Sequence, residues 1–370
     1  MKKGSLVIIS ALLLIVYVFI KEESQQKNIE IGTEFYVGTY TKNSSEGIYK
    51  YSLRTDGTID SLGLVAKTEN PSFLVKSIDK KYLLSVNENE EGTVESFEIE
   101  NDSLKFINRS STGGAHPCFI TINNKGNVLV ANYTGGNVGL LQLAGDGKIS
   151  HLLDVQQHYG NGSSLDNQKS PHAHSVWFNE ADNKIISVDL GTNELIMSSI
   201  DYNENRFIDS SQYKIKMAHG AGPRHLTFHP KKNWIYVVNE INSTVSLLIK
   251  EEENYVVKSS YSTLPENFEG ENNCADIHVS DDGKFLYASN RGHNSIVIFS
   301  INTNGALTQL GLQSTKGNAP RNFSLSPDNK FILVANQLTE NIVSFKRNAK
   351  TGLLTYVMEV KAPTPVCILF

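Results

Sequence analysis

The chain has 370 residues, with 34 basic and 39 acidic side chains and a formal net charge of −5. A mildly acidic chain lacks the excess of cations with which nucleic-acid-binding proteins neutralise phosphates, so the composition excludes that class. The three cysteines, Cys118, Cys274 and Cys367, are too few for a disulfide framework and have no CxxC spacing, which argues against a structural zinc site. A chain of this length ordinarily folds as two or three domains of about 100–200 residues each.

The first thirty residues have the composition of a targeting segment. Two lysines precede residues 4–20, a stretch of 17 residues without a charged side chain. A basic leader before an apolar stretch predicts an export signal or a membrane anchor, and the length is at the lower limit for a membrane-spanning helix. The lysines favour an N-terminus in the cytoplasm, with the rest of the chain exported to the periplasmic or extracellular side. We expect residues 1–30 to be this leader and a short linker.

Two alternatives stay open for the leader. No small-x-small cleavage site follows residues 18–20, which favours a retained anchor over a cleaved signal peptide. A buried core helix is less favoured, because no helical pattern follows it for the helix to pack against. The only contact with a membrane that we expect is through this segment.

From Ile31 onward, the sequence predicts strands rather than helices. Short runs rich in Val, Ile, Tyr and Phe alternate with Asn, Asp and Gly. Six runs end in Asn or Asp and recur every 45 to 57 residues: residues 82–87, 128–132, 185–189, 234–239, 285–290 and 331–336. A period of this length indicates one repeated architecture instead of several unrelated domains.

Each repeat contains the signals of four strands. A turn such as residues 281–284 precedes each run, and an apolar strand, often introduced by proline as at Pro223, precedes the turn. A third strand follows each run, as at residues 295–299, and a weaker fourth follows a glycine-containing turn. Four antiparallel strands in each unit of about 40–50 residues predict an all-β fold, the β-propeller.

The two ends of the repeated region carry complementary halves of a further unit. Residues 365–370 have the pattern of an innermost strand, and residues 35–40 have that of a second strand without its first. Joining them completes a seventh blade and closes the ring, which leaves no open sheet edge. We therefore predict one seven-bladed β-propeller over residues 31–370, in which Cys118 and Cys367 are small buried residues of innermost strands.

The topology also predicts which face carries the chemistry. In a blade, the loop entering the first strand and the loop leaving the second lie on one face, so residues at these points converge on one mouth of the channel. Polar residues where a first strand begins are His116, His172, His174, Arg224, His225, Arg321 and Asn322. Glu240 and Arg291 stand where a second strand ends. Arginines, a glutamate and histidines in adjacent blades predict an anion-binding site that contains an acid–base group.

Each of these residues also has a structural explanation. The Asn that ends most runs is expected to cap turns. Arg224 and Arg321 share a repeat position and could form salt bridges between blades, and His225 could be a satisfied histidine beside the channel. His172 and His174 would point to one side of an extended segment, which also suits a metal. No third ligand stands at a matching spacing, so no metal is expected.

The pattern of motifs resembles a known family. The segments that carry the resemblance are residues 35–41, 171–175, 222–225, 238–240 and 289–292. They look like the lactonase family of seven-bladed propellers, which includes 6-phosphogluconolactonases and fungal muconate-lactonizing enzymes. The resemblance extends from Phe35 to the C-terminus. It implies an active site of His172 or His174, Arg224, Glu240 and Arg291.

The activity that this resemblance implies is hydrolysis of a sugar lactone to its aldonic acid, with no cofactor. Glu240 or one of His172 and His174 would act as the general base. Arg224 and Arg291 would hold an anionic group of the substrate and stabilise negative charge at the carbonyl. The expected partner is a small anionic sugar lactone. The leader distinguishes this chain from cytoplasmic members of the family, so whether the lactone is phosphorylated stays open.

Two other functions remain alternatives. An exported propeller could bind a carbohydrate or a protein partner without turnover, because a fold does not determine a function. A calcium-dependent sugar lactonase would need carboxylate and Asn ligands, such as Glu240 with Asn132 or Asn290, but neighbouring arginines would repel the cation. Residues 158–170 and 265–273 are long loops on the same face, either flaps over the site or ordinary surface loops.

Overall fold

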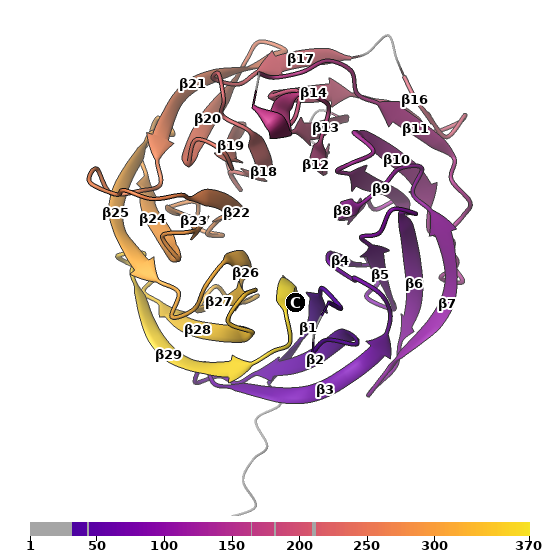
Figure 1. The fold of residues 1–370 in the computed structure, drawn as a ribbon, viewed down its shortest axis with the longest axis horizontal. Coiled ribbons are helices and arrows are strands. Elements are labelled where there is room, and N and C mark those ends of the chain that lie inside the picture. The colour runs from indigo at the N-terminus through magenta and orange to yellow at the C-terminus, as the bar shows by residue number, and fades with distance from the viewer. Residues whose placement is uncertain (1–31, 43, 164, 181–182, 209–211) are drawn as a thin grey trace, which may run out of the picture.

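The computed structural model describes residues 32–42, 44–163, 165–180, 183–208 and 212–370. Within these residues the chain forms seven four-stranded antiparallel sheets arranged around a central axis (Figure 1), which confirms the predicted seven-bladed propeller. The predicted leader, residues 1–30, lies outside the described residues. Among the residues that are described, no helix is long and apolar enough to cross a membrane.

The blades are numbered here along the chain, each from its innermost strand outward. Blade 1 contains β4 (Leu74–Lys76), β5 (Tyr82–Asn87), β6 (Thr93–Ile99) and β7 (Leu104–Ser111). Blade 2 contains β8 (Pro117–Ile122), β9 (Asn127–Asn132), β10 (Asn137–Gln142) and β11 (Asp154–Gln157). Blade 3 contains β12 (Ala173–Asn179), β13 (Lys184–Asp189), β14 (Glu194–Ser198) and β17 (Tyr213–Lys216).

The remaining blades follow the same plan. Blade 4 contains β18 (Pro223–Phe228), β19 (Trp234–Asn239), β20 (Thr244–Glu251) and β21 (Asn254–Ser262). Blade 5 contains β22 (Asn273–Val279), β23 (Phe285–Arg291), β24 (Ser295–Ile301) and β25 (Leu307–Ser314). Blade 6 contains β26 (Pro320–Leu325), β27 (Phe331–Asn336), β28 (Asn341–Arg347) and β29 (Leu354–Lys361). Blade 7 contains β30 (Pro365–Leu369), β1 (Thr33–Thr39), β2 (Gly47–Leu53) and β3 (Ile59–Lys67).

The second strands have more buried side chains than the outermost strands, and this difference explains where the apolar runs lie in the sequence. All residues of β9 and β27 are buried, because second strands pack against neighbouring blades on both faces. The outermost strands β7 and β29 alternate exposed and partly buried residues, because they meet solvent on one side. The apolar runs that repeat along the sequence are therefore the second strands.

The ring closes where the two ends of the propeller meet. Strand β30 is the innermost strand of blade 7 and pairs antiparallel with β1, with Val37 opposite Ile368 and Gly38 opposite Cys367. This pairing confirms that the innermost strand of that blade comes from the C-terminal end of the chain. Cys118 and Cys367 are buried in innermost strands, as predicted, and all three cysteines are free.

A repeated β-bulge marks the beginning of the innermost strands. The register with the second strand shifts around one extra residue, which is Cys118, His174, Arg224 or Arg321 in blades 2, 3, 4 and 6. In blade 5 the shift lies between Cys274 and Ile277. A bulge redirects the extra side chain away from its normal place in the strand. Three of the four extra residues are predicted site residues.

The loop that precedes blade 3 is bound to that blade. The loop contains a short 3-10 helix, η1 (Asp166–Gln168). A separate small hairpin of β15 (Ile200–Asp201) and β16 (Arg206–Phe207) follows β14. The Nδ1 atom of His158 lies 2.6 Å from Oδ2 of Asp189, and the buried Gln168 amide donates to the Leu190 carbonyl. These contacts attach both ends of residues 158–168 to the turn after β13.

Closure of the ring predicts a specific loss of stability. Phe35 is fully buried in β1, and its ring centroid lies 5.6 Å from that of Tyr51 and 5.2 Å from that of Phe370. Phe35→Ala is expected to lower the free energy of unfolding by about 3–5 kcal/mol, because it leaves a cavity where the two chain ends meet. Denaturant unfolding measures this loss. Phe106→Ala, at a side chain that is 53% exposed, is the control and should cost less than about 1 kcal/mol.

Candidate active site

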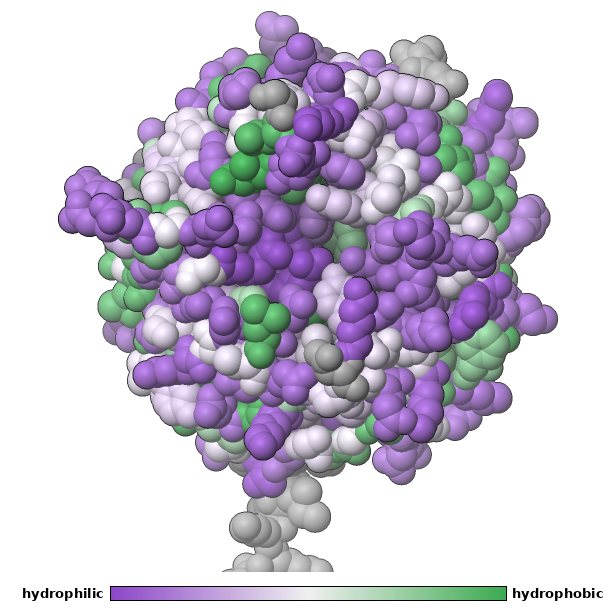
Figure 2. All heavy atoms as spheres, viewed as in Figure 1, coloured by the Kyte–Doolittle hydropathy of each residue, from purple (hydrophilic) through white to green (hydrophobic). Residues whose placement is uncertain are grey.

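The site is built from two kinds of position that the blade topology brings together. Bulge residues come from the beginning of innermost strands, and a second set of side chains comes from the end of second strands. Glu240 directly follows β19, and Arg291 is the last residue of β23. The centre of the face seen in Figure 2 is hollowed, and hydrophilic residues line this hollow.

Glu240 is the centre of a charged cluster. Its Oε2 atom lies 2.9 Å from Nε of Arg224, 3.0 Å from Nη2 of Arg291 and 3.9 Å from Nε2 of His174. The Glu240 side chain is 18% exposed, although its Oε2 atom itself is fully buried. We call Glu240, Arg224, Arg291 and His174 the charged cluster. The structure thus brings together four residues that the sequence placed in three successive blades.

The arginines determine the protonation state of Glu240. Burial alone would raise the pKa of this carboxyl, but Arg291, Arg224 and Arg321 hold the pKa below its usual value. Burial, together with the charges of Arg291 and Arg321, lowers the pKa of Arg224 to about 10. Glu240 is therefore ionised, and both arginines paired with it remain charged near neutral pH.

His174 is held as a neutral imidazole. Burial, followed by the charges of Arg224, His225 and Arg321, keeps the pKa of His174 well below its usual value. Its Nδ1 atom lies 3.6 Å from Sγ of Cys118, whose thiol donates to the His174 carbonyl oxygen at 3.3 Å. A thiol that donates elsewhere leaves its sulfur as an acceptor for an Nδ1–H group. This arrangement favours the tautomer in which Nε2 of His174, the atom nearest Glu240, is unprotonated.

His172 lies outside the charged cluster. Its ring stacks on Tyr133 with centroids 4.5 Å apart, and its Nδ1 atom lies 3.1 Å from the Tyr133 carbonyl oxygen. Its backbone N–H donates to Oδ1 of Asp189 at 2.9 Å. His174 meets the same Tyr133 ring at its edge, 5.4 Å between centroids. Of the two histidines, only His174 comes within 4 Å of Glu240.

His225 and Asn322 belong to a buried network around Asp276. The Asp276 carboxylate lies 2.9 Å from Nδ1 of His225 and 3.1 Å from Nε2 of His278, and it accepts from the Asn322 amide at 2.6 Å. Burial lowers the pKa of His225 to about 4. Burial would raise the pKa of Asp276, but His278 and His225 hold it far below its usual value. An Nδ1–H of neutral His225 therefore donates to Asp276, and its Nε2 faces Nη1 of Arg224 at 3.3 Å.

Arg321 lies between the charged cluster and a second acidic residue. Its guanidinium lies 5.4 Å from the ring centroid of Tyr40, whose hydroxyl donates to both carboxylate oxygens of Glu88 at 2.9 Å. Burial lowers the pKa of Arg321, but Tyr40, Glu88 and Glu240 raise it above its usual value. No carboxylate of the described residues lies within ion-pair distance of Arg321, so its donors remain available to a ligand.

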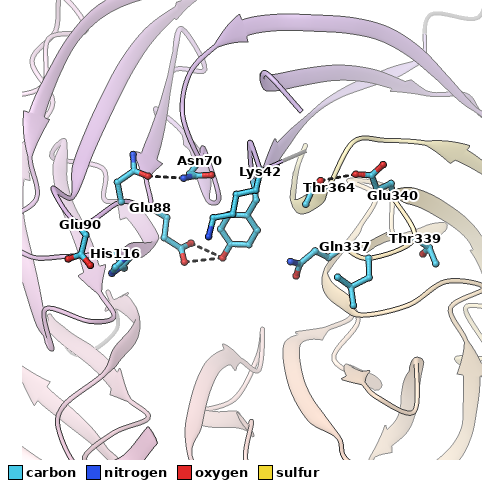
Figure 3. Close-up of a pocket in the computed structure, with 12 residues that line it drawn as sticks. Lys42, Asn70, Glu88, Glu90, His116, Gln337, Thr339, Glu340 and Thr364 are labelled. Atoms are coloured by element: carbon cyan, nitrogen blue, oxygen red, sulfur yellow. Dashed lines mark hydrogen bonds between the residues drawn. The ribbon is translucent and has the colours of Figure 1, made fainter. Parts of the chain in front are cut away.

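A large pocket adjoins this cluster. It has a volume of about 840 Å³, and Figure 3 shows its opposite walls with Lys42 between them. We call it the outer pocket; it is lined by Tyr40, Lys42, Asn70, Glu88, Asn89, Glu90, His116, Gln337, Leu338, Thr339, Glu340 and Thr364. His116 is the predicted site residue that lies here rather than in the charged cluster. Its Nδ1 atom is buried and makes no hydrogen bond among the described residues.

We find no arrangement of metal ligands among the described residues. There, no group of three or more His, Cys, Asp or Glu side chains is arranged to hold a metal ion. Glu240, the carboxylate that a calcium site would need, is already paired with two guanidinium groups.

Three residues of the site were missed by sequence reasoning. Tyr40 and Glu88 directly follow β1 and β5, the same repeat position that Glu240 occupies after β19. Asp276 lies within the register shift of β22, between Cys274 and Ile277, next to the strand position that His225 occupies after the bulge of β18. The repeat could have identified all three. Asp276 escaped notice because blade 5 begins with Asn273 and Cys274, without the proline that introduces the other blades.

Comparisons with known proteins agree with the fold and the motifs. A family model described as "Lactonase, 7-bladed beta-propeller" matches residues 34–370. The chain is 34% identical over 348 residues to a 6-phosphogluconolactonase from Bacillus subtilis, covering 90% of this chain and 97% of that protein. It is 37% identical over 332 residues to a 6-phosphogluconolactonase from Formosa agariphila, covering 86% and 94%.

A solved structure extends the likeness to three dimensions. The periplasmic gluconolactonase of Pseudomonas aeruginosa matches with a TM-score of 0.85 and 28% identity, covering 91% of this chain and 98% of that one. The family model covers the whole propeller, and the relatives match along almost their entire length. The chain therefore belongs to the lactonase family of seven-bladed β-propellers.

Proposed function

We propose that this protein hydrolyses a sugar lactone to its aldonic acid. The observation that carries the proposal is the pairing of a largely buried, ionised Glu240 with two arginines beside the neutral imidazole of His174. A lactonase-family propeller with relatives named 6-phosphogluconolactonase and gluconolactonase supports the same reaction class. Hydrolysis of the ester needs an activated water, a stabilised oxyanion and a proton for the leaving oxygen.

The distance between Glu240 and His174 suits one bridging water. At 3.9 Å, Oε2 of Glu240 and Nε2 of His174 are too far apart for a direct hydrogen bond, and because Oε2 is buried against the two guanidinium groups, the attacking water is placed between Nε2 of His174 and the other Glu240 carboxylate oxygen. His174 accepts a proton from this water as its oxygen attacks the lactone carbonyl. Glu240 orients the water and stabilises the imidazolium that forms. Arg224 and Arg291 keep Glu240 ionised and in place.

Arg321 is the cation that the substrate can reach. Because no carboxylate of the described residues pairs with it, its N–H groups can stabilise the oxyanion that develops on the carbonyl oxygen. The bond between the carbonyl carbon and the ring oxygen then breaks. The imidazolium of His174 returns its proton to that ring oxygen, and the new carboxylic acid ionises to release one proton.

We also propose that the reaction takes place outside the cytoplasm. The apolar segment of residues 4–20 and the periplasmic gluconolactonase among the relatives support this location. Fractionation of cells that express the full-length chain tests it, and recovery of the protein in the cytoplasmic fraction alone would contradict it.

The site assignment predicts the effect of two substitutions. Glu240→Gln removes the charge that orients the water, and Arg321→Ala removes an oxyanion donor, so each should lower kcat on the order of 10²–10³-fold. Acid release from 6-phosphogluconolactone and from gluconolactone, measured with the full-length protein, gives kcat. Glu251→Gln and Arg206→Ala, at exposed positions, are the controls. Wild-type kcat in both site variants would refute the assignment. In a separate test of the wild-type protein, activity that is lost in EDTA and restored by calcium would favour a calcium-dependent lactonase.

The electrostatics of the charged cluster predict an unusual pH profile. Because the pKa values of Glu240 and His174 are both lowered, both groups keep their deprotonated forms as the pH falls through about 6.5. We expect kcat/KM to show no decline as the pH falls through about 6.5, the ordinary pKa of histidine, and to decline only at lower pH. Initial rates corrected for spontaneous hydrolysis measure this. An acid limb centred near pH 6.5 would show that an unperturbed histidine acts as the base.

Asp276 is predicted to act as a positioning residue. Asp276→Asn removes the carboxylate charge and replaces one of its two acceptor oxygens with an N–H donor, which weakens the hold on the Nδ1–H tautomer of His225 and, through His225, on the position of Arg224 beside Glu240. The expected result is a fall in kcat on the order of 10²-fold with unchanged KM, since Asp276 does not contact the substrate. Nitrogen NMR of the histidine rings should show the changed tautomer. Asp281→Asn, on the exposed turn after β22, should leave both constants unchanged.

A further inference from the structure

The mouth of the propeller is electrically asymmetric. On one side, Arg224, Arg291 and Arg321 outnumber the single carboxylate of Glu240. On the other side, the outer pocket presents three carboxylates and one ammonium group. They belong to Glu88, Glu90, Glu340 and Lys42. Figure 3 shows Glu88 and Glu90 on one wall and Glu340 on the opposite wall.

The two halves adjoin but do not share the residues of the charged cluster. Tyr40 lines the outer pocket, and the Arg321 guanidinium lies over its ring. None of the charged-cluster residues lines the pocket, so its volume is additional to the space beside Glu240. At about 840 Å³ it lies in the upper part of the range of about 300–1,000 Å³ for pockets that enclose drug-sized ligands. A single lactone ring bound at the charged cluster would leave most of the outer pocket unfilled.

We propose that the outer pocket binds a neutral, polyhydroxylated extension of the substrate, so that the preferred lactone is unphosphorylated and carries a second sugar ring. This inference rests on the proposed lactone hydrolysis. The carbonyl must lie beside Glu240 and Arg321, which directs the rest of the molecule past Tyr40 into the outer pocket.

The lining of the pocket matches the hydroxyl groups of a sugar. An ionised carboxylate offers about four acceptor sites, and the Glu340 carboxylate uses one oxygen for the hydroxyls of Ser44 and Thr364. The amides of Asn89 and Gln337 can both donate and accept, as sugar hydroxyls do. The pocket therefore has acceptors for hydroxyl protons from several directions.

The same lining disfavours a phosphate. A phosphate at the far end of the lactone would meet Glu88 and Glu90 at short range, and like charges in a partly desolvated site repel. Lys42 alone does not compensate for three carboxylates. The charge asymmetry of the mouth therefore gives the two halves different roles. The arginines stabilise the anion that forms during the reaction, and the outer pocket accepts the rest of the substrate, which should be neutral.

Three substrates test the inference on the full-length protein. We expect kcat/KM for a glycosyl aldonolactone to exceed that for gluconolactone by about tenfold, the effect of one or two additional hydrogen bonds. We expect kcat/KM for 6-phosphogluconolactone to be lower than that for gluconolactone. A glycosyl aldonolactone that is hydrolysed more slowly than gluconolactone would overturn the inference while leaving the proposed function intact.

Two variants locate the effect in the pocket. Gln337→Trp should fill the pocket and remove the tenfold preference for the longer lactone, whereas Gln309→Trp, on the exposed outer strand β25, should preserve it. Glu90→Lys should raise the ratio of phosphorylated to unphosphorylated kcat/KM by about tenfold, and Glu253→Lys, on the exposed β20–β21 turn, should not. A preference that survives Gln337→Trp would contradict the inference.

A binding measurement separates this inference from the proposed function. The glycosyl aldonate, the stable product of the longer lactone, can be titrated calorimetrically whether or not any lactone is turned over. Binding that weakens about tenfold in Gln337→Trp but not in Gln309→Trp supports the pocket even without catalysis. Equal affinities of both variants for the aldonate would overturn it.

Discussion

Closure of the ring is the constraint on which the rest of the molecule depends. Each blade is a twisted sheet with an exposed edge, and the pairing of β30 with β1 inside blade 7 closes the circle by joining the two ends of the propeller. Once the ring is closed, the seven innermost strands are held side by side. Residues from distant parts of the sequence, such as Tyr40 and Arg321, can then lie in contact without any long connecting loop.

A local irregularity turns this scaffold into a site. The bulges at the beginning of the innermost strands redirect His174, Arg224 and Arg321, and the ends of the second strands supply Glu240 and Arg291. Glu240 stays ionised because the charges of the arginines outweigh the effect of its burial, whereas His174 stays neutral because burial and the same cations both disfavour its protonation. Strand register, more than loop conformation, therefore decides the protonation states of the charged cluster.

Most of the fold could be predicted from the sequence, because period, turn residues and strand composition all reflect the same local geometry. The complementary segments at residues 35–40 and 365–370 predicted the closing blade as well. The site was predictable only as a set of residues on one face. A bulge adds one residue without a compositional signal, so the sequence could not distinguish His172 from His174. The isolation of Arg321 from carboxylates and the convergence of donors on Asp276 depend on packing between blades.

The Asp276 network limits how this site can change during evolution. Asp276 and His278 come from blade 5, His225 from blade 4, and Asn322 and the Phe323 backbone N–H from blade 6. In a repeat architecture, each unit contacts mainly its neighbours, so its stability depends on the interfaces between adjacent units. A blade replaced singly here would leave a buried carboxylate or a buried histidine without its counterpart, which is strongly destabilising. The buried network thus couples the inner strands of blades 4, 5 and 6 to one another.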